Sequence, residues 1–81
     1  MSKADKTFSK MKNNPRDWSI EDVISVTDRH TIEHRNDGGS HFVFSHPEIQ
    51  EAVTVPAHRP INQVYIKKII AMIEKIKEQT K

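Results

Sequence analysis

Hydrophobic residues are spread unevenly along this chain, and their spacing is clearest toward the C-terminal end. From Tyr65 to Ile76 apolar residues recur every three or four positions, with charged residues between them. This spacing is typical of an amphipathic helix that packs one face against a core. Asn62 stands just before the stretch and suits the N-cap of that helix. We expect the isoleucines of this helix to be buried.

A shorter helical pattern occurs earlier in the chain. Between Ile20 and Thr27 the apolar residues again follow helical spacing, although over fewer turns. Ser19 precedes them and Asp22 follows it three positions later, which resembles an N-cap with an acidic residue in the first turn. The pattern predicts a helix over residues 20–29.

Three stretches between the two helices predict strands. They cover residues 31–36, 40–45 and 52–55, and the last of them stops at Pro56. The first two are separated by Asn36-Asp37-Gly38-Gly39, which is a strong turn signal. The predicted order is therefore α-β-β-β-α, an α+β fold with a three-stranded antiparallel sheet and two helices on one face.

Side-chain alternation in the second strand assigns its residues to the two faces of the sheet. Phe42 and Phe44 point to one side, and His41 points to the other. Because the phenylalanines belong beneath the helices, His41 is expected on the uncovered face. Gly38 and Gly39 are the only glycines in the chain, and glycine allows a turn with positive φ just before this strand.

The composition narrows the possible classes of protein. The chain has 81 residues, which fits one domain, and it contains no cysteine. Disulfides, thiolate metal sites and cysteine nucleophiles are therefore excluded. No apolar run reaches the roughly 20 residues that a membrane-spanning helix needs, so no membrane partner is expected. The basic N-terminal segment lacks the apolar stretch of a secretory signal, and a cytoplasmic location fits these features.

The net charge of +2 conceals three segments of different sign. Residues 1–16 carry +4, residues 17–58 carry −6 and residues 59–81 carry +4. Residues 1–14 are rich in lysine and lack a sustained apolar pattern, so we expect a flexible basic arm ahead of a single domain over residues 15–81. Both basic segments suit phosphate binding, but charge alone favours a solvated tail and a solvated helix face.

His41 is the residue with the clearest catalytic chemistry. An imidazole changes its protonation near neutral pH and can take or give a proton. Held on a strand beside an open turn, His41 is a candidate catalytic residue. A hydrogen-bonded structural histidine is the alternative at this position.

Several motifs, taken in order, resemble the HicA toxins of bacterial HicAB toxin–antitoxin systems. The similarity extends over about residues 20–73 and includes both helices. The motifs are Gly39-Ser40-His41 before an apolar strand, His46-Pro47, Val53-Thr54-Val55-Pro56 and His58.

This resemblance implies a fold like that of double-stranded-RNA-binding domains. It also implies an mRNA interferase, an endoribonuclease that cleaves mRNA without the ribosome. A HicB-type antitoxin protein would neutralise the enzyme by covering its active site. The histidine of the Gly-Ser-His motif, which is His41 here, is the catalytic residue that the resemblance implies.

Three features depart from the commoner pattern of these toxins. Asp37 and Gly38 occupy a neighbourhood that is often basic. Thr31 stands near the place of a glycine that often ends the first helix. An N-terminal extension precedes the usual start.

A protein that cleaves RNA need not supply a nucleophile, because the 2′-hydroxyl beside the scissile phosphate is one. The protein positions the strand, moves protons and stabilises charge. We expect His41 to take the 2′-hydroxyl proton or to protonate the leaving oxygen, for a gain of roughly 10²–10⁴-fold. Ser40 and the amides of Gly38 and Gly39 are expected to hold a phosphate oxygen. This scheme needs no metal or other cofactor and leaves DNA uncut.

Further contacts to mRNA, either single-stranded or structured, are expected from His58, Arg59, Lys67 and Lys68. His58 is a candidate second proton-transfer group, or only a loop residue or phosphate contact. Lys67 and Lys68 lie near the start of the last helix, where double-stranded-RNA modules place basic residues, although solvated lysines are the alternative.

The remaining histidines suit structural positions. His46 precedes a proline in a turn, and His30 and His34 fall at a helix end and on the surface. The five histidines lack a recognisable spacing of zinc ligands.

Two other functions remain open at this point. One is a non-catalytic RNA-binding or adaptor module of the same fold, in which substitution of His41 would matter little. The other is a structural interaction domain without affinity for RNA. The salt dependence of RNA binding distinguishes the structural interaction domain from the RNA-binding alternatives, because affinity that depends on phosphate contacts falls steeply with salt.

Overall fold

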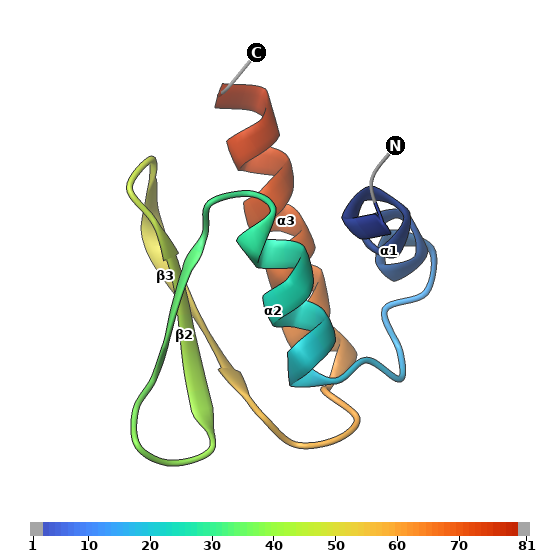
Figure 1. The fold of residues 1–81 in the computed structure, drawn as a ribbon, viewed down its shortest axis with the longest axis vertical. Coiled ribbons are helices and arrows are strands. Elements are labelled where there is room, and N and C mark those ends of the chain that lie inside the picture. The colour runs from blue at the N-terminus through green and yellow to red at the C-terminus, as the bar shows by residue number, and fades with distance from the viewer. Residues whose placement is uncertain (1–2, 80–81) are drawn as a thin grey trace.

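The computed structural model describes residues 3–79 and has an α+β fold (Figure 1). Its elements are α1 (Lys3–Asn13), α2 (Ile20–Asp28), β1 (Glu33–Asn36), β2 (His41–His46), β3 (Ile49–Pro56) and α3 (Gln63–Gln79). The three strands form one antiparallel sheet, and α2 and α3 lie on one side of it. From α2 onward, the order confirms the predicted α-β-β-β-α arrangement.

Helix α2 begins where the sequence predicts. The backbone N–H of Asp22 donates to Oγ of Ser19 at 3.3 Å, and the backbone N–H of Ser19 donates to Oδ2 of Asp22 at 3.0 Å. This reciprocal pair is a capping box, which satisfies two backbone donors that the first helical turn leaves without partners. The cap thus fixes the start of the helix at Ile20.

The chain leaves α2 through a backbone conformation that is unusual for a β-branched residue. Thr31 has a φ of +56°, in the left-handed region where glycine is favoured. Its hydroxyl donates to the carbonyl of His30 at 2.6 Å and lies 3.3 Å from Nε2 of His46. The predicted first strand starts at Glu33 rather than at Thr31, because this turn occupies the intervening positions.

The sheet has the order β1-β2-β3, so β2 is central and the two other strands are edges. Phe42 pairs with Val55 and Phe44 pairs with Val53, which places four apolar side chains on one face. A two-residue turn at Pro47 joins β2 to β3, and β3 begins at Ile49, earlier than the predicted residue 52. The strand is longer because Ile49 pairs with His46, beyond an irregularity in the register between Phe44 and His46.

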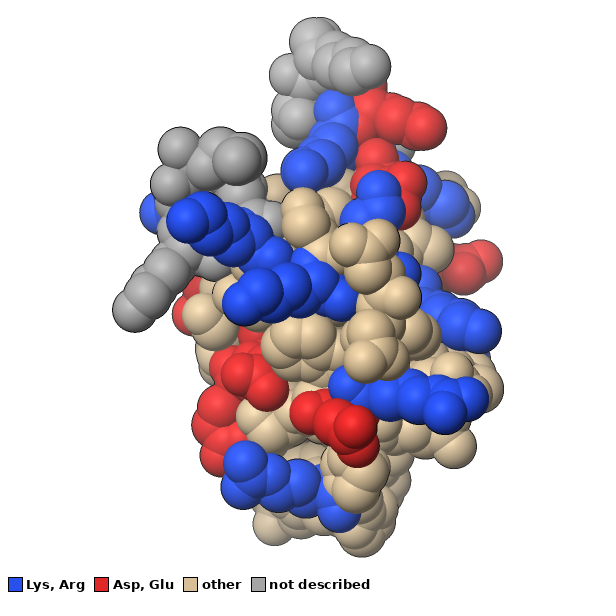
Figure 2. Space-filling model, turned by 90° about the vertical axis from the view of Figure 1, so that its right-hand side faces the viewer, with Lys and Arg blue, Asp and Glu red and all other residues tan. Residues whose placement is uncertain are grey.

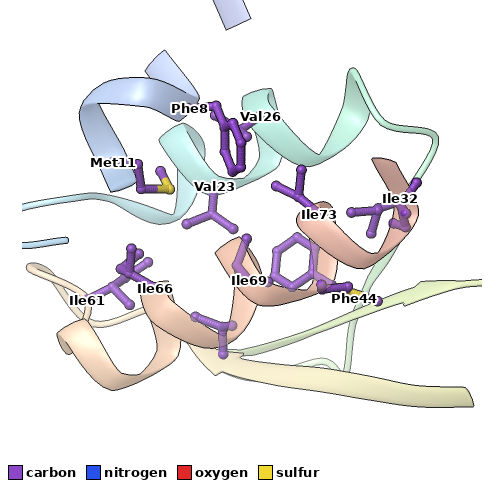
Figure 3. Packing of buried hydrophobic residues seen from close by; sticks show 13 residues of the cluster. Phe8, Met11, Val23, Val26, Ile32, Phe44, Ile61, Ile66, Ile69 and Ile73 are labelled. Atoms are coloured by element: carbon purple, nitrogen blue, oxygen red, sulfur yellow. The ribbon is translucent and has the colours of Figure 1, made fainter. Parts of the chain in front are cut away.

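The core lies between the sheet and the helices and extends to α1 (Figure 3). Phe44 is fully buried and lies close to Ile69 and Ile73 of α3. The buried hydrophobic residues are Phe8, Met11, Val23, Val26, Ile32, Phe44, Val55, Ile61, Ile66, Ile69, Met72, Ile73 and Ile76. The expected burial of the α3 isoleucines is confirmed, with Ile70 only partly buried.

The prediction of a flexible arm over residues 1–14 is wrong for its described part. Residues Lys3–Asn13 form a helix, and Phe8 and Met11 on one side of it are buried against α2 and α3 (Figure 3). Burying a large apolar side chain contributes about 1.5–3 kcal/mol, which offsets the weak helical tendency of so short a segment. Met1 and Ser2 lie outside the described residues. The core therefore includes the N-terminal segment that the sequence pattern separates from it.

None of the helices within residues 3–79 is both long enough and apolar enough to cross a membrane.

Candidate active site

The turn between β1 and β2 is held by its own side chains. Asn36 Nδ2 donates to the carbonyl of Gly39 at 3.0 Å, and Oδ1 of Asn36 accepts from the amide of Gly38 at 2.8 Å. Gly38 has a φ of +92°, a conformation that residues with a side chain rarely adopt. The turn thus needs a glycine at position 38, and it delivers the chain directly into β2.

Asp37 fills the place where a phosphate oxygen was expected. Its Oδ1 accepts from the amide of Gly39 at 2.9 Å, while the amide of Gly38 donates to Asn36. The two amides predicted to form an anion-binding nest are therefore already satisfied within the protein. A phosphate could use them only by displacing these side chains, so the predicted role of Gly38 and Gly39 is corrected.

His41 is the first residue of β2 and stands at the open end of the ladder. It pairs with Pro56, the last residue of β3, so it lies at the end of the sheet where β3 leads toward α3. The His41 side chain is 51% exposed, in agreement with the predicted uncovered face. Its Nδ1 lies 3.7 Å from Oδ2 of Asp37, four residues earlier.

This Asp37–His41 pair has the arrangement of a base and its orienting group. The carboxylate faces Nδ1, so a proton on Nδ1 leaves Nε2 as the acceptor on the other side of the ring. The separation exceeds that of a hydrogen bond, as is common for catalytic groups before substrate binds. The position of Asp37 beside His41 was not predicted from the sequence. Its signal was the Asp-Gly-Gly turn, in which aspartate commonly bonds the backbone two residues later.

His58 and Arg59 lie at the same end of the sheet as His41. The amide of Ala57 donates to the carbonyl of Ser40 at 2.6 Å, which ties the loop after β3 to the β1–β2 turn. Both His58 and Arg59 are exposed in that loop. The structure thus brings the loop of these two predicted residues to the turn that carries Ser40.

Lys67 and Lys68, by contrast, face different parts of the surface. Lys67 lines a cavity between α1 and α3, whereas Lys68 lines a cavity between β3 and α3. Neighbouring residues on a helix are about 100° apart around its axis, so adjacent side chains can reach different surfaces. The two lysines predicted as RNA contacts therefore line different cavities.

The other histidines have structural contacts. His46 Nδ1 accepts from the amide of Glu48 at 3.0 Å within the turn, as its predicted turn position suggests. His34 lies 3.6 Å from Asp28, and its ring centroid is 6.1 Å from that of Phe44, so it covers the edge of the core. Within residues 3–79, no three histidine or acidic side chains gather in a way that could hold a metal ion.

Three cavities of the described residues are not lined by His41. One of about 480 Å³ lies between α1 and α3, and two of about 360 and 350 Å³ lie between β3 and α3. A half-exposed histidine on an open surface keeps water around the reacting groups, which weakens electrostatic stabilisation of a transition state. The arrangement suits proton transfer at a modest rate, on a substrate that brings its own nucleophile.

Comparison of the chain with known protein families, curated proteins and solved structures found no match.

Proposed function

We propose that this chain is a metal-independent endoribonuclease of the HicA kind, with His41 as its proton-transfer residue. The observation that supports it best is the placement of His41 beside Asp37 at the open end of β2, with half of its side chain exposed. The order of elements from α2 to α3 agrees with the arrangement that the resemblance implies. We propose, as part of the same hypothesis, that the fold is like that of double-stranded-RNA-binding domains.

The proposed reaction uses the 2′-hydroxyl of RNA as nucleophile. Nε2 of neutral His41 takes the hydroxyl proton while the 2′-oxygen attacks phosphorus and the bond to the 5′-oxygen breaks. The products are a 2′,3′-cyclic phosphate and a 5′-hydroxyl, whose proton comes from His58 or from water. Asp37 stabilises the imidazolium that forms on His41. DNA lacks the nucleophile and is not cut.

The proposed rate is low because the site is open. A well-placed general base contributes roughly 10²–10⁴-fold, and water around the half-exposed His41 weakens any further electrostatic stabilisation. Slow cleavage suffices for a toxin that inactivates essential messages. We propose that the enzyme acts in the cytoplasm and is neutralised by a HicB-type antitoxin that covers the end of the sheet where His41 lies.

The test compares the protein with its His41→Ala variant on single-stranded RNA and on DNA of the same sequence, in EDTA. We expect RNA to be cut with cyclic-phosphate ends, DNA to stay intact and the variant to lose activity. His34→Ala is the matched control, because it removes an imidazole that pairs with Asp28 elsewhere on the molecule. Equal activity of His41→Ala and the parent protein would exclude His41 as the catalytic residue.

A second candidate is the non-catalytic RNA-binding module of the same fold. The observation that favours it is that three cationic side chains line the cavity between α1 and α3, a cavity that His41 does not line. In that case RNA binds in a salt-dependent manner, no cut is made, and His41→Ala leaves affinity unchanged.

A further inference from the structure

The cavity between α1 and α3 is lined by cations from three separate segments. Lys12 comes from α1, Arg16 from the linker after it and Lys67 from α3, whereas Glu74 is the one acid in the lining. We call this feature the α1–α3 groove. Figure 2 shows the side of the molecule on which α1 lies, where Lys and Arg side chains are spread over the surface with acids between them.

The groove keeps an excess of positive charge after its internal pairing is counted. Lys12 Nζ lies 3.3 Å from Oε1 of Glu74, and both side chains are about half exposed. Such a pair is weak, and a phosphate can compete for Lys12. The side chains of Arg16 and Lys67 form no salt bridge with any residue in the described part of the chain.

The cations of the groove are held by a folded framework. Phe8 and Met11 anchor α1 in the core, which positions Lys12. The carbonyl of Asn14 accepts from Nε1 of Trp18 at 2.6 Å, and Oδ1 of Asn14 accepts from the amide of Arg16 at 3.3 Å. A fixed array loses less conformational entropy on binding a ligand than a flexible basic tail does.

Backbone contacts connect the groove to the end of the molecule that carries His41. The turn before β2 is bonded to the loop after β3 through Ser40 and Ala57, and that loop is bonded to the α1–α2 linker through Ile61 and Trp18, at 2.9 Å. Arg59 lies exposed between these two contacts. A polyanion crossing this end of the molecule would therefore pass from His41 along the loop to the groove.

We propose that the α1–α3 groove binds the RNA backbone on one side of the cleavage position, with Arg16 and Lys67 as phosphate contacts and Lys12 as a third. This inference rests on the proposed function and extends it, since it assigns α1 and its linker to substrate binding. The contacts are to phosphates, so they add affinity without selecting a base sequence.

The test measures RNA binding separately from cleavage. Variants are made in the His41→Ala background, so that single-stranded RNA remains intact, and affinity is followed as salt is raised. The test variant is Arg16→Gln with Lys67→Gln. The matched control is Arg29→Gln with Lys75→Gln, which removes the same charge from two exposed residues outside the groove, one at the end of α2 and one in the cavity on the β3 side of α3.

We expect the test variant to bind RNA roughly tenfold more weakly near 0.1 M salt. The slope of log affinity against log salt should also be smaller by about 1.4, because each phosphate contact to a single strand contributes about 0.7 and the variant removes two. The control should lose roughly twofold at most, because charges away from the RNA path act through a field screened over about 10 Å. Lys67→Gln alone, a change at one exposed position, should give about half the slope change.

An unchanged slope in the test variant, or an equal loss in the control, would overturn the groove assignment. Cleavage that depends on His41 would survive that result, so the two proposals fail separately. In the active protein, the test variant should lower kcat/KM for a long RNA and leave a dinucleotide substrate unaffected, because a dinucleotide has a single phosphodiester. Equal losses on both substrates would also contradict the assignment.

Discussion

The carboxylate of Asp37 touches both parts of the candidate site: Oδ1 accepts from the amide of Gly39 at 2.9 Å, and Oδ2 lies 3.7 Å from Nδ1 of His41. One side chain thus shapes the turn and orients the histidine that follows it. The same negative charge repels the RNA phosphate on which the histidine is proposed to act. The carboxylate should therefore raise the rate of cleavage and lower the affinity for RNA, and the two effects can be measured separately.

Asp37→Asn keeps an acceptor for the amide of Gly39 and removes the charge. We expect kcat for RNA cleavage to fall by about fivefold, since a half-exposed ion pair contributes about 1 kcal/mol or less, while affinity for RNA rises. Steady-state kinetics and a separate binding titration give both values. Asp28→Asn, which removes an equal charge beside His34, should change neither. A fall of several thousandfold would point instead to a tightly coupled catalytic pair.

Phe8→Ala tests whether α1 belongs to the core. Phe8 is 4% exposed, and truncation of a buried phenylalanine costs about 3–5 kcal/mol. In a domain whose whole stability is about 5–15 kcal/mol, such a loss should move the urea midpoint far down. Lys10→Ala, at an exposed position on the same helix, is the control and should change stability by less than about 0.5 kcal/mol. Equal midpoints for the two variants would mean that α1 does not contribute to the core.

Thr31→Gly should stabilise the protein. The left-handed conformation costs a residue with a side chain about 1–2 kcal/mol, and glycine avoids this cost. Glycine also loses more conformational entropy on folding, which offsets part of the gain in stability. We expect a net gain of about 0.5–1 kcal/mol in thermal or urea unfolding. Thr31→Ala keeps the strained backbone and loses the contact with His46, so it should be less stable than the parent protein. A loss of stability in Thr31→Gly would show that the hydroxyl contacts outweigh the strain.

The helices that could be predicted are those whose signals are local. Ser19 and Asp22 form the capping box that starts α2, and the spacing of the isoleucines defines α3 over several turns. Helix α1 could not be predicted in this way. Its apolar side is reduced to Phe8 and Met11 among lysines, and its order depends on a surface that α2 and α3 create only after folding.

The candidate site was predicted in part for the same reason. The position of His41 on the uncovered face follows from strand alternation with Phe42 and Phe44, which is a local rule. The bonding of the glycine amides is also local, because Asn36 and Asp37 each accept from the amide two residues later, as these residues commonly do in turns, but this signal was not used. The separation of Lys67 from Lys68 depends on where α1 and β3 lie beside α3.

The ring of Phe8 joins the first and last helices through more than its burial. Nζ of Lys12 lies 5.5 Å from its centroid and Nζ of Lys77 lies 4.7 Å from it, within the range of cation–π attraction. Residues nearly seventy positions apart in sequence therefore share one aromatic group. Shortening the chain from its N-terminal end would remove a contact from the final turns of α3, so the two ends of this domain cannot be trimmed or varied independently.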